Sequence, residues 1–218
     1  PDVEVTAIAA RDRGRAEQHA RELGIPYVHD SYVDLLASSE VDAVYVPLPN
    51  SLHGPWSIRA LEAGKHVLCE KPVTSNEKQA RAVADVAART GLVVCEAMHS
   101  VYHGLYDRTA EILAAGTIGD VEHVSVRVHM PIPNRNNIRW KYELGGGAMM
   151  DLGVYAVTVL RTLAGMEVAA VLSATGRTRT PLVDRCVTAE VCFPNGATGS
   201  VSVSMWGWPP LAVGASVR

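Results

Sequence analysis

Strand-like and helix-like segments alternate through the first 96 residues, and no other feature of the sequence constrains the fold as tightly. The segments between the strands end at Gly24, Gly64 and Gly91, and glycine is common just after the last turn of a helix. Such alternation through short links predicts a doubly wound α/β fold, a parallel sheet with helices on both faces. The predicted strands are residues 3–10, 27–28, 41–46, 66–69 and 92–95.

Local capping signals place the helices of this half more closely. A helix is predicted over residues 15–23, and Asp30 or Ser31 can cap a second, short helix. A third is predicted from Pro55 to Ala63, because proline is favoured in the first turn of a helix. The segment 74–77 (TSNE) matches a capping box, so a fourth helix is predicted to run from there to residue 90.

The pattern changes near residue 98. Helices are predicted over residues 105–115 and 148–163, and the turn 194–196 (PNG) is typical of a hairpin. This half is an α+β domain with antiparallel strands, so we expect two domains, residues 1–98 and 99–218. Its predicted strands are residues 121–130, 168–175, 183–193 and 197–205.

Composition excludes several classes of function. The net charge of -3 provides no general basic surface, so nucleic-acid binding is not expected. No run of about 18 apolar residues is present, so we expect no membrane span. The cysteines form no CxxC pair and lie in strand-like runs, which favours free thiols in a reducing, cytoplasmic compartment. They are Cys69, Cys95, Cys186 and Cys192.

Polar or proline-containing segments follow four of the predicted strands. Arg11 follows the first of these strands, the segment 47–53 (PLPNSLH) follows the second, and Glu70-Lys71-Pro72 follows the third. The segment 96–99 (EAMH) follows the fourth. In open parallel sheets, ligands bind outside the carboxyl ends of the strands. We therefore expect the four segments to converge on one crevice.

Two basic residues in these segments each have two interpretations. An arginine such as Arg11 at a strand end suits the 2′-phosphate of a dinucleotide, whereas an acidic residue would suit a free 2′-hydroxyl. The alternative is that Arg11 only solvates the strand end. Lys71 precedes Pro72, which favours extended backbone and directs the lysine side chain toward a neighbour or a substrate oxygen. The alternative is a surface lysine in a turn.

Asp151 and Tyr155 lie four residues apart in the predicted helix 148–163 and therefore share a face. Three glycines, residues 145–147, lead into this helix, and Gly153 inside it indicates a close approach by a ligand or another backbone. A tyrosine can exchange protons if a cation lowers its pKa from about 10. The alternative is a half-buried core tyrosine and an aspartate at a helix N-terminus.

The loop 131–141 and two histidines complete the candidate site. The loop carries amide and guanidinium groups, among them Arg139 beside Trp140, which suit a polyol or acid substrate; an ordinary solvated loop is the alternative. His99 and His103 are four residues apart, but no further ligand has suitable spacing, so we expect no metal. We expect these histidines to line a pocket.

Three segments in this order, PLPNSLH, AGKHVLCEKP and GGGAMMDLGVYAV, resemble the glucose–fructose oxidoreductase / inositol dehydrogenase / MocA family. The resemblance extends from Val3 to about Trp206 and is greatest with the dimeric dihydrodiol and D-xylose dehydrogenase-like branch. It implies a Rossmann domain followed by an α+β domain, whose open, mostly antiparallel sheet makes the contacts of a homodimer or higher homo-oligomer. The family's first strand, its glycine-rich phosphate loop and its last strands are missing, so we expect this chain to be part of a longer protein.

The resemblance also implies a reaction, in which a hydride moves between nicotinamide and a hydroxyl-bearing carbon of a sugar, polyol or dihydrodiol. It implies that Lys71 contacts the reacting hydroxyl and that Asp151 positions the substrate. Tyr155, with its pKa lowered by Lys71, would remove the hydroxyl proton. His99, Arg139 and Trp140 would border the substrate. The residues expected to bind the cofactor are Arg11, Pro47, Leu48, Pro49, Asn50, His53, Glu70, Lys71 and Pro72.

NADP is the expected cofactor, with NAD as the alternative, because members with tyrosine at the position of Tyr155 mostly use NADP. Two other functions remain open for this fold. One is a nucleotide-sensing regulator without catalytic activity, and the other is an NAD-dependent glycosidase. Around Val101 and His103 the sequence departs from the family, where arginine and aromatic residues are common, so the identity of the substrate stays open.

Overall fold

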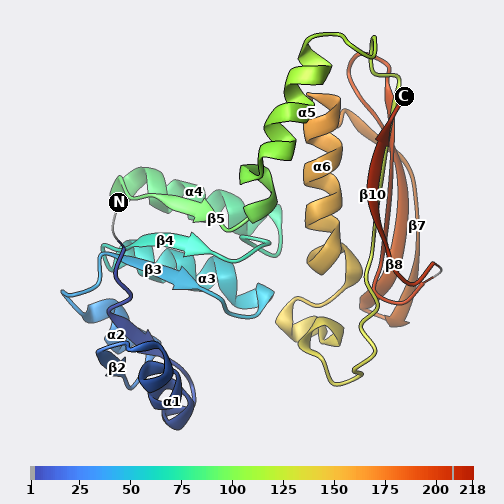
Figure 1. Ribbon diagram of the computed structural model, residues 1–218. Helices are drawn as coiled ribbons and strands as arrows, with labels where there is room; N and C mark the ends of the chain where they lie inside the picture. The colour runs from blue at the N-terminus through green and yellow to red at the C-terminus, as the bar shows by residue number, and fades with distance from the viewer. Residues whose placement is uncertain (1–2, 208) are drawn as a thin grey trace.

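The computed structural model describes residues 3–207 and 209–218. The first two residues of the predicted domain 1–98, Pro1 and Asp2, and also Trp208, lie outside the described residues. Within them, a parallel-stranded N-terminal part is followed by a C-terminal part in which two helices lie beside a long sheet (Figure 1). The predicted fold class, a Rossmann-type α/β part followed by an α+β part, is therefore confirmed.

The N-terminal part contains two parallel sheets. Strands β1 and β2 pair with each other, while β3, β4 and β5 form a second sheet in that order. The parallel pairing is confirmed, but the single sheet expected from the sequence is not formed by the described residues. The elements are β1 Ala7–Ala9, α1 Arg13–Leu23, β2 Tyr27–His29, α2 Tyr32–Ala37, β3 Ala43–Val46, α3 Asn50–Glu62, β4 His66–Cys69, α4 Glu77–Thr90 and β5 Val94–Glu96.

The first strand is shorter and more exposed than its apolar sequence predicts. Only Ala7–Ala9 pairs, because the partner β2 is three residues long. Val3 and Val5 are 86% and 63% exposed, so the prediction of a buried strand over residues 3–10 is wrong for its first half.

Helix starts differ from the predictions at two places. Helix α3 begins at Asn50, so Pro55 lies inside it, and the missing amide of Pro55 costs one backbone hydrogen bond. The Asn50 side chain at the start of the helix donates to the carbonyl oxygen of Gly145. At α4 the cap is Asn76, whose side chain accepts from the amide of Gln79, and not Thr74 as the capping box predicted. Ser31 caps α2 as expected.

The C-terminal part is built on a five-stranded sheet in the order β10-β6-β9-β8-β7, with only β6 and β9 parallel. The mostly antiparallel sheet and the hairpin between β8 and β9 are thus confirmed. Strand β10 was not predicted; it forms by pairing along β6. The elements are α5 Gly104–Ala114, β6 His123–His129, α6 Val154–Ala164, β7 Ala170–Thr180, β8 Val183–Cys192, β9 Thr198–Ser204 and β10 Ala212–Val217.

Helix α6 covers the sheet and forms the centre of the C-terminal core. Ala156 and Leu160 are buried against the sheet in the same cluster as Val124 and Val203. By length and composition alone the stretch Tyr142–Ala164 could span a bilayer, but half of its most apolar part is buried inside the protein. We therefore assign this stretch to the core that packs against the sheet.

Candidate functional site

Lys71 and Asp151 meet where the two parts of the chain face each other. The Lys71 Nζ donates to the backbone carbonyl oxygen of Asp151 at 2.9 Å and to its Oδ1 at 3.2 Å. Both side chains are largely buried, 13% and 10% exposed. The Arg139 Nε donates to the other carboxylate oxygen, Oδ2, at 2.7 Å. One buried carboxylate therefore holds two cations, as a desolvated carboxylate requires.

A π-helical segment, Met149–Gly153, presents Asp151 to Lys71. The continuous α-helix predicted from residue 148 is wrong here, because the carboxylate of Asp184 accepts from the amide of Met149 and anchors a wider first turn. Gly153 is approached closely, but not by a ligand or another backbone as predicted: the approaching group is the Met149 side chain of the same helical segment, and a Cβ on Gly153 would lie 2.8 Å from its Cε.

Gly146 fixes the loop that carries Arg139. A Cβ at residue 146 would lie 2.5 Å from the carbonyl oxygen of Arg139 and 2.8 Å from that of Lys141, and these are backbone atoms. The amide of Gly147 donates to the carbonyl oxygen of Arg139 at 3.0 Å. The glycines at residues 145–147 thus let the loop 131–141 pack closely enough for Arg139 to reach Asp151.

Tyr155 lies beside the charged pair, with the Lys71 Nζ 4.7 Å from its ring centroid. His99 packs edge-on against the same ring, with centroids 6.1 Å apart. Burial and the negative charges of Glu70 and Asp151 raise the pKa of Tyr155 above its ordinary value. The expectation that Lys71 lowers this pKa is wrong for this structure, because the ammonium lies over the ring face and is itself paired with Asp151.

Glu70 and Glu96 organise the strand ends next to Lys71. Glu70 accepts from the Tyr45 hydroxyl at 2.6 Å and from the amide of Lys71 at 3.2 Å. The hydrogen bond to Glu70 raises the pKa of Tyr45 to about 12. Glu96 accepts from the amide of Val73 at 2.7 Å, so the end of β5 supports the turn after β4.

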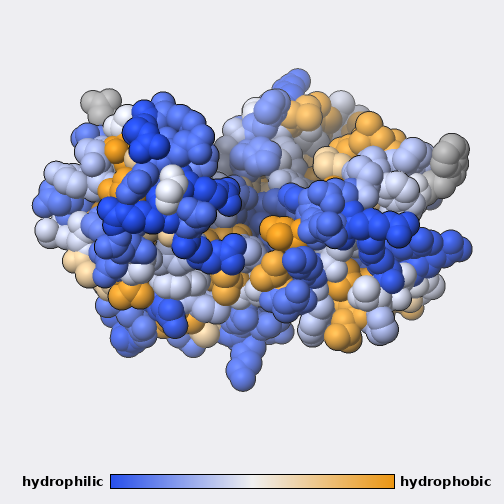
Figure 2. Space-filling model, turned by 90° about the horizontal axis from the view of Figure 1, so that it is seen from below, coloured by the Kyte–Doolittle hydropathy of each residue, from blue (hydrophilic) through white to orange (hydrophobic). Residues whose placement is uncertain are grey.

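A cavity of about 310 Å³ opens on these groups. Seen from below (Figure 2), the surface is mostly hydrophilic and is hollowed between the two parts of the chain. The carboxyl ends of β3 and β4 therefore converge with the loop 131–141 and the π-helical segment. The prediction that all four strand-end segments meet at one crevice is confirmed only for these two, because Arg11 and the segment 96–99 do not line the cavity. The lining residues are Tyr45, Pro47, Leu48, Asn50, His53, Glu70, Lys71, Ile138, Arg139, Leu144, Gly145 and Asp151.

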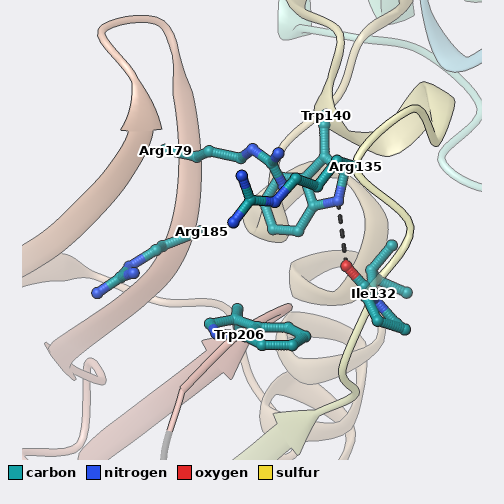
Figure 3. A pocket seen from close by; sticks show the side chains of 7 residues that line it. Ile132, Arg135, Trp140, Arg179, Arg185 and Trp206 are labelled. Carbon is teal, nitrogen blue, oxygen red and sulfur yellow. Dashed lines mark hydrogen bonds between the residues drawn. The ribbon is translucent and has the colours of Figure 1, made fainter.

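Several predicted site residues are placed differently. His53 lines the cavity but is almost fully buried, and its ring nitrogens lie 2.7 and 2.6 Å from the carbonyl oxygens of Pro72 and Leu48, so both are engaged with the protein itself. Arg11 is exposed two residues beyond β1 and does not line this cavity. Trp140 faces a second cavity, with its indole N–H donating to the carbonyl oxygen of Ile132 at 3.2 Å (Figure 3).

Sequence reasoning missed Tyr45, Ile138, Leu144 and Gly145 among the lining residues. Tyr45 gives one signal, since it is the polar-tipped residue in an otherwise apolar strand. The other three reach the cavity through tertiary packing that residue spacing does not encode. Within the described residues, no group of three His, Cys, Asp or Glu side chains is arranged to hold a metal ion.

Two family models match the chain. Residues 1–98 match an oxidoreductase family with an NAD-binding Rossmann fold, and residues 106–214 match the GFO/IDH/MocA C-terminal domain. The first match ends just after β5, and the second begins within α5.

The chain is also similar to individual proteins named as reductases and dehydrogenases. The chain is 41% identical to the dTDP-3,4-didehydro-2,6-dideoxy-alpha-D-glucose 3-reductase of Streptomyces violaceoruber, over 77% of this chain and 48% of that protein. It is 40% identical to D-xylose 1-dehydrogenase (NADP(+)) 2 of Haloferax volcanii, over 92% of this chain and 62% of that protein. The crystal structure of a 3-ketoreductase from Actinomadura kijaniata with NADP and TDP-benzene has a TM-score of 0.91 and 33% identity, over 99% of this chain and 65% of that one. The chain thus spans between about half and two thirds of the length of these relatives.

Proposed function

Because the chain belongs to the GFO/IDH/MocA family of oxidoreductases, we propose that it forms the catalytic part of an NADP-dependent enzyme. The reaction exchanges a hydride between nicotinamide and a hydroxyl-bearing carbon of a sugar or a related polyol. The relatives named as a D-xylose dehydrogenase and as a sugar 3-reductase support this class of substrate.

One observation carries the proposal: Lys71, Asp151 and Tyr155 come together from distant segments at the edge of the sheet where the parallel strands end. A cation and a buried carboxylate at one cavity, with a neutral phenol next to the cation, suit proton exchange with a substrate hydroxyl. A cluster with only a structural role would not need an open cavity, whereas Lys71 and Asp151 line a cavity of about 310 Å³.

The residues present fit the nicotinamide end of NADP. Pro47 and Leu48 provide an apolar wall for a planar ring, and Asn50, Glu70 and Lys71 provide polar groups for ribose hydroxyls at the same edge. Arg11 is exposed beyond β1, and its guanidinium is suited to the 2′-phosphate. When bound, NADP supplies the carbon that gives or takes the hydride.

The residues of this chain then position the substrate and move its proton. The Lys71 ammonium, held by Asp151, stabilises charge on the reacting oxygen. Since burial and nearby carboxylates raise the pKa of the Tyr155 phenol and keep it protonated, it would donate its proton to a substrate carbonyl oxygen in the reducing direction. In the oxidising direction the same hydroxyl must first lose its proton. Arg139 fixes Asp151 from the opposite side.

We propose that the enzyme is cytoplasmic and assembles as a homo-oligomer through its C-terminal sheet. All eleven residues of the edge strand β7 are exposed, which supports an interface there. Light scattering of the purified protein would show a multiple of the chain mass if this is correct, and the mass of one chain if it is not.

The full-length protein tests the function directly. NADPH and NADH are titrated by nicotinamide fluorescence, and turnover is followed with sugars and keto sugars. We expect tighter binding of NADPH, a loss of that preference in Arg11→Ala, and a fall in kcat of about 10²-fold or more in Lys71→Ala. Lys78→Ala, which alters an exposed lysine of α4, is the matched control. Binding of NADPH without turnover of any sugar would instead support a nucleotide-sensing regulator, and sugar cleavage without net cofactor reduction would support a glycosidase.

A further inference from the structure

Asp184 is a half-buried carboxylate of the C-terminal sheet to which the proposed reaction gives no role. It is the second residue of β8, and its Oδ2 accepts from the backbone amide of Met149 at 2.8 Å. Met149 begins the π-helical segment that presents Asp151 to Lys71. A strand of the C-terminal sheet is thereby joined to the first residue of that segment.

The carboxylate supplies a helix cap that the local sequence lacks. The π-helical segment starts after Ala148, whose side chain accepts no hydrogen bond. Because the first amides of a helix have no partner within it, a side-chain acceptor there stabilises the start of the helix. Asp184 provides this acceptor from another strand, and its negative charge suits the positive end of a helix.

Gly147 makes room for the same carboxylate. A Cβ at residue 147 would collide with the Oδ1 of Asp184, and the backbone φ of +131° also disfavours any other residue type. Both carboxylate oxygens therefore face the turn from Gly147 to Met149, with Oδ1 against the first residue and Oδ2 on the amide of the last.

The pairing of β8 is irregular at this point. Asp184 pairs with Thr178 of β7, and the register of the two strands shifts on both sides of that pair. Such irregularities re-aim side chains and are common next to active sites. This observation is independent of the helix contact, because it concerns pairing within the sheet.

The turn that Asp184 holds is bonded to the residues of the Lys71 site. The carbonyl oxygen of Gly147 accepts from the amide of Asp151, and the amide of Gly147 donates to the carbonyl oxygen of Arg139, both at 3.0 Å. A displacement of the turn would therefore move Asp151 and Arg139 together. The Lys71 ammonium would move with them, since Asp151 holds it through two oxygens.

We propose that Asp184 is a positioning residue for the Lys71–Asp151 pair. Among the described residues no cation lies within ion-pair distance of Asp184, so we expect its hydrogen bond, and not its charge, to carry the effect. Its effect on turnover rests on the proposed function. A displacement of about 1 Å at a reacting group can lower a rate by about 10²-fold.

The first test needs no activity and measures how fast Lys71 of the full-length protein is acetylated by an N-hydroxysuccinimide ester, followed by mass spectrometry. The ammonium is 13% exposed and held by Asp151, so it should react slowly. We expect Asp184→Ala to speed acetylation of Lys71 by about tenfold. Asp184→Asn keeps an acceptor oxygen and should react like the unchanged protein. The exposed Lys78 is the internal reference.

Asn76→Ala is the matched control, because it also removes a side-chain cap from a helix, the bond of 3.0 Å to the amide of Gln79. It should leave the acetylation of Lys71 unchanged. If Asp184→Ala does not bind NADPH and so is not folded, Asp184→Glu replaces it. The longer side chain keeps the charge but does not fit the space at Gly147, so the same faster acetylation is expected.

The second test measures kcat per NADPH-binding site, so that unfolded protein is not counted. We expect kcat to fall by about 10²-fold in Asp184→Ala, with the affinity for NADPH retained, and to return in Asp184→Asn. A role in stability alone would lower the number of binding sites and leave kcat per site unchanged.

The outcomes separate this inference from the proposed function. Equal acetylation of Lys71 in Asp184→Ala and the unchanged protein overturns the inference, and so does unchanged kcat per site. Asp184→Asn behaving like Asp184→Ala also overturns it, because the charge would then carry the effect. If the unchanged protein oxidises or reduces no sugar, the proposed function is rejected, and the acetylation rates alone decide whether Asp184 positions the pair.

Discussion

The Lys71 ammonium is bonded to Asp151 twice, through the backbone carbonyl oxygen and through the carboxylate. The two residues are 80 positions apart in the chain. Lys71 lies in the turn after β4, and Asp151 lies in the π-helical segment before α6. The double contact fixes both the position of the ammonium and the orientation of the π-helical segment. It makes Asp151 a positioning residue for Lys71 as well as a candidate substrate contact.

Removing the carboxylate is expected to destabilise the protein. Asp151→Ala leaves the largely buried ammonium of Lys71 without its counter-charge, which typically costs about 3–5 kcal/mol of unfolding free energy, and it also removes the partner of the more exposed Arg139 guanidinium. Denaturant unfolding measures the loss, with Glu77→Ala, which breaks an exposed pair with Arg81, as a control expected to lose no more than about 1 kcal/mol. Equal losses in the two variants would contradict the assignment of a desolvated pair.

The pH dependence of turnover reports the phenol of Tyr155. Its pKa is raised above the ordinary 10.0, so in the reducing direction kcat should stay constant from neutral pH to about pH 10 and fall above that. In Tyr155→Phe, kcat should drop by about 10²–10⁴-fold and the alkaline fall should disappear. A variant that keeps its turnover, or keeps the alkaline fall, would show that another group gives the proton.

Gly146→Ala is expected to damage the site without touching any charged group. The added Cβ would lie 2.5 Å from the carbonyl oxygen of Arg139, so the loop must move and Arg139 must lose its contact with Asp151. We expect a raised KM and a lowered kcat from steady-state kinetics. Gly104→Ala, where a Cβ meets nothing within 4 Å, is the control and should retain normal kinetics. Normal kinetics in Gly146→Ala would mean that the loop tolerates displacement.

Cys69 gives a prediction about alkaline stability. The thiol is fully buried, and burial raises its pKa from 9.0 to about 11. Because the folded pKa exceeds the unfolded one, the stabilisation is complete below pH 9 and is lost as the pH rises toward 11. The unfolding free energy of the unchanged protein should therefore fall by about 2 kcal/mol more over this range than that of Cys69→Ala. Cys95→Ala, which changes a partly exposed thiol, should show the same fall as the unchanged protein.

Strand positions could be predicted from the sequence where a short apolar run forms a strand, as at His66–Cys69. Strand β10 could not, because its six residues are mostly small and follow two prolines, and its strand form comes from pairing with β6. The single parallel sheet was also predicted wrongly, because periodicity identifies strands but not which strands pair.

The site was predicted in part. Lys71, Asp151 and Tyr155 were identified by resemblance and lie together, although spacing could relate only the last two. The pKa of Tyr155 could not be predicted from the presence of a lysine, because its sign depends on burial and on where the ammonium points. Trp140 was assigned to the substrate site together with Arg139, since adjacent loop residues give no indication that they face opposite sides.

The hydrogen bond from the Asn50 side chain to the carbonyl oxygen of Gly145, at 3.0 Å, joins the same two parts of the chain as the Lys71–Asp151 pair. Together these contacts hold the N-terminal and C-terminal parts of the chain against each other. Any hinge motion that separates the two parts of the chain to admit or release a reactant must break the contact between the Lys71 ammonium and the Asp151 carboxylate. The groups proposed for the chemistry would then also govern how often the cleft opens, so a substitution at Lys71 would change the rate of product escape as well as the rate of reaction.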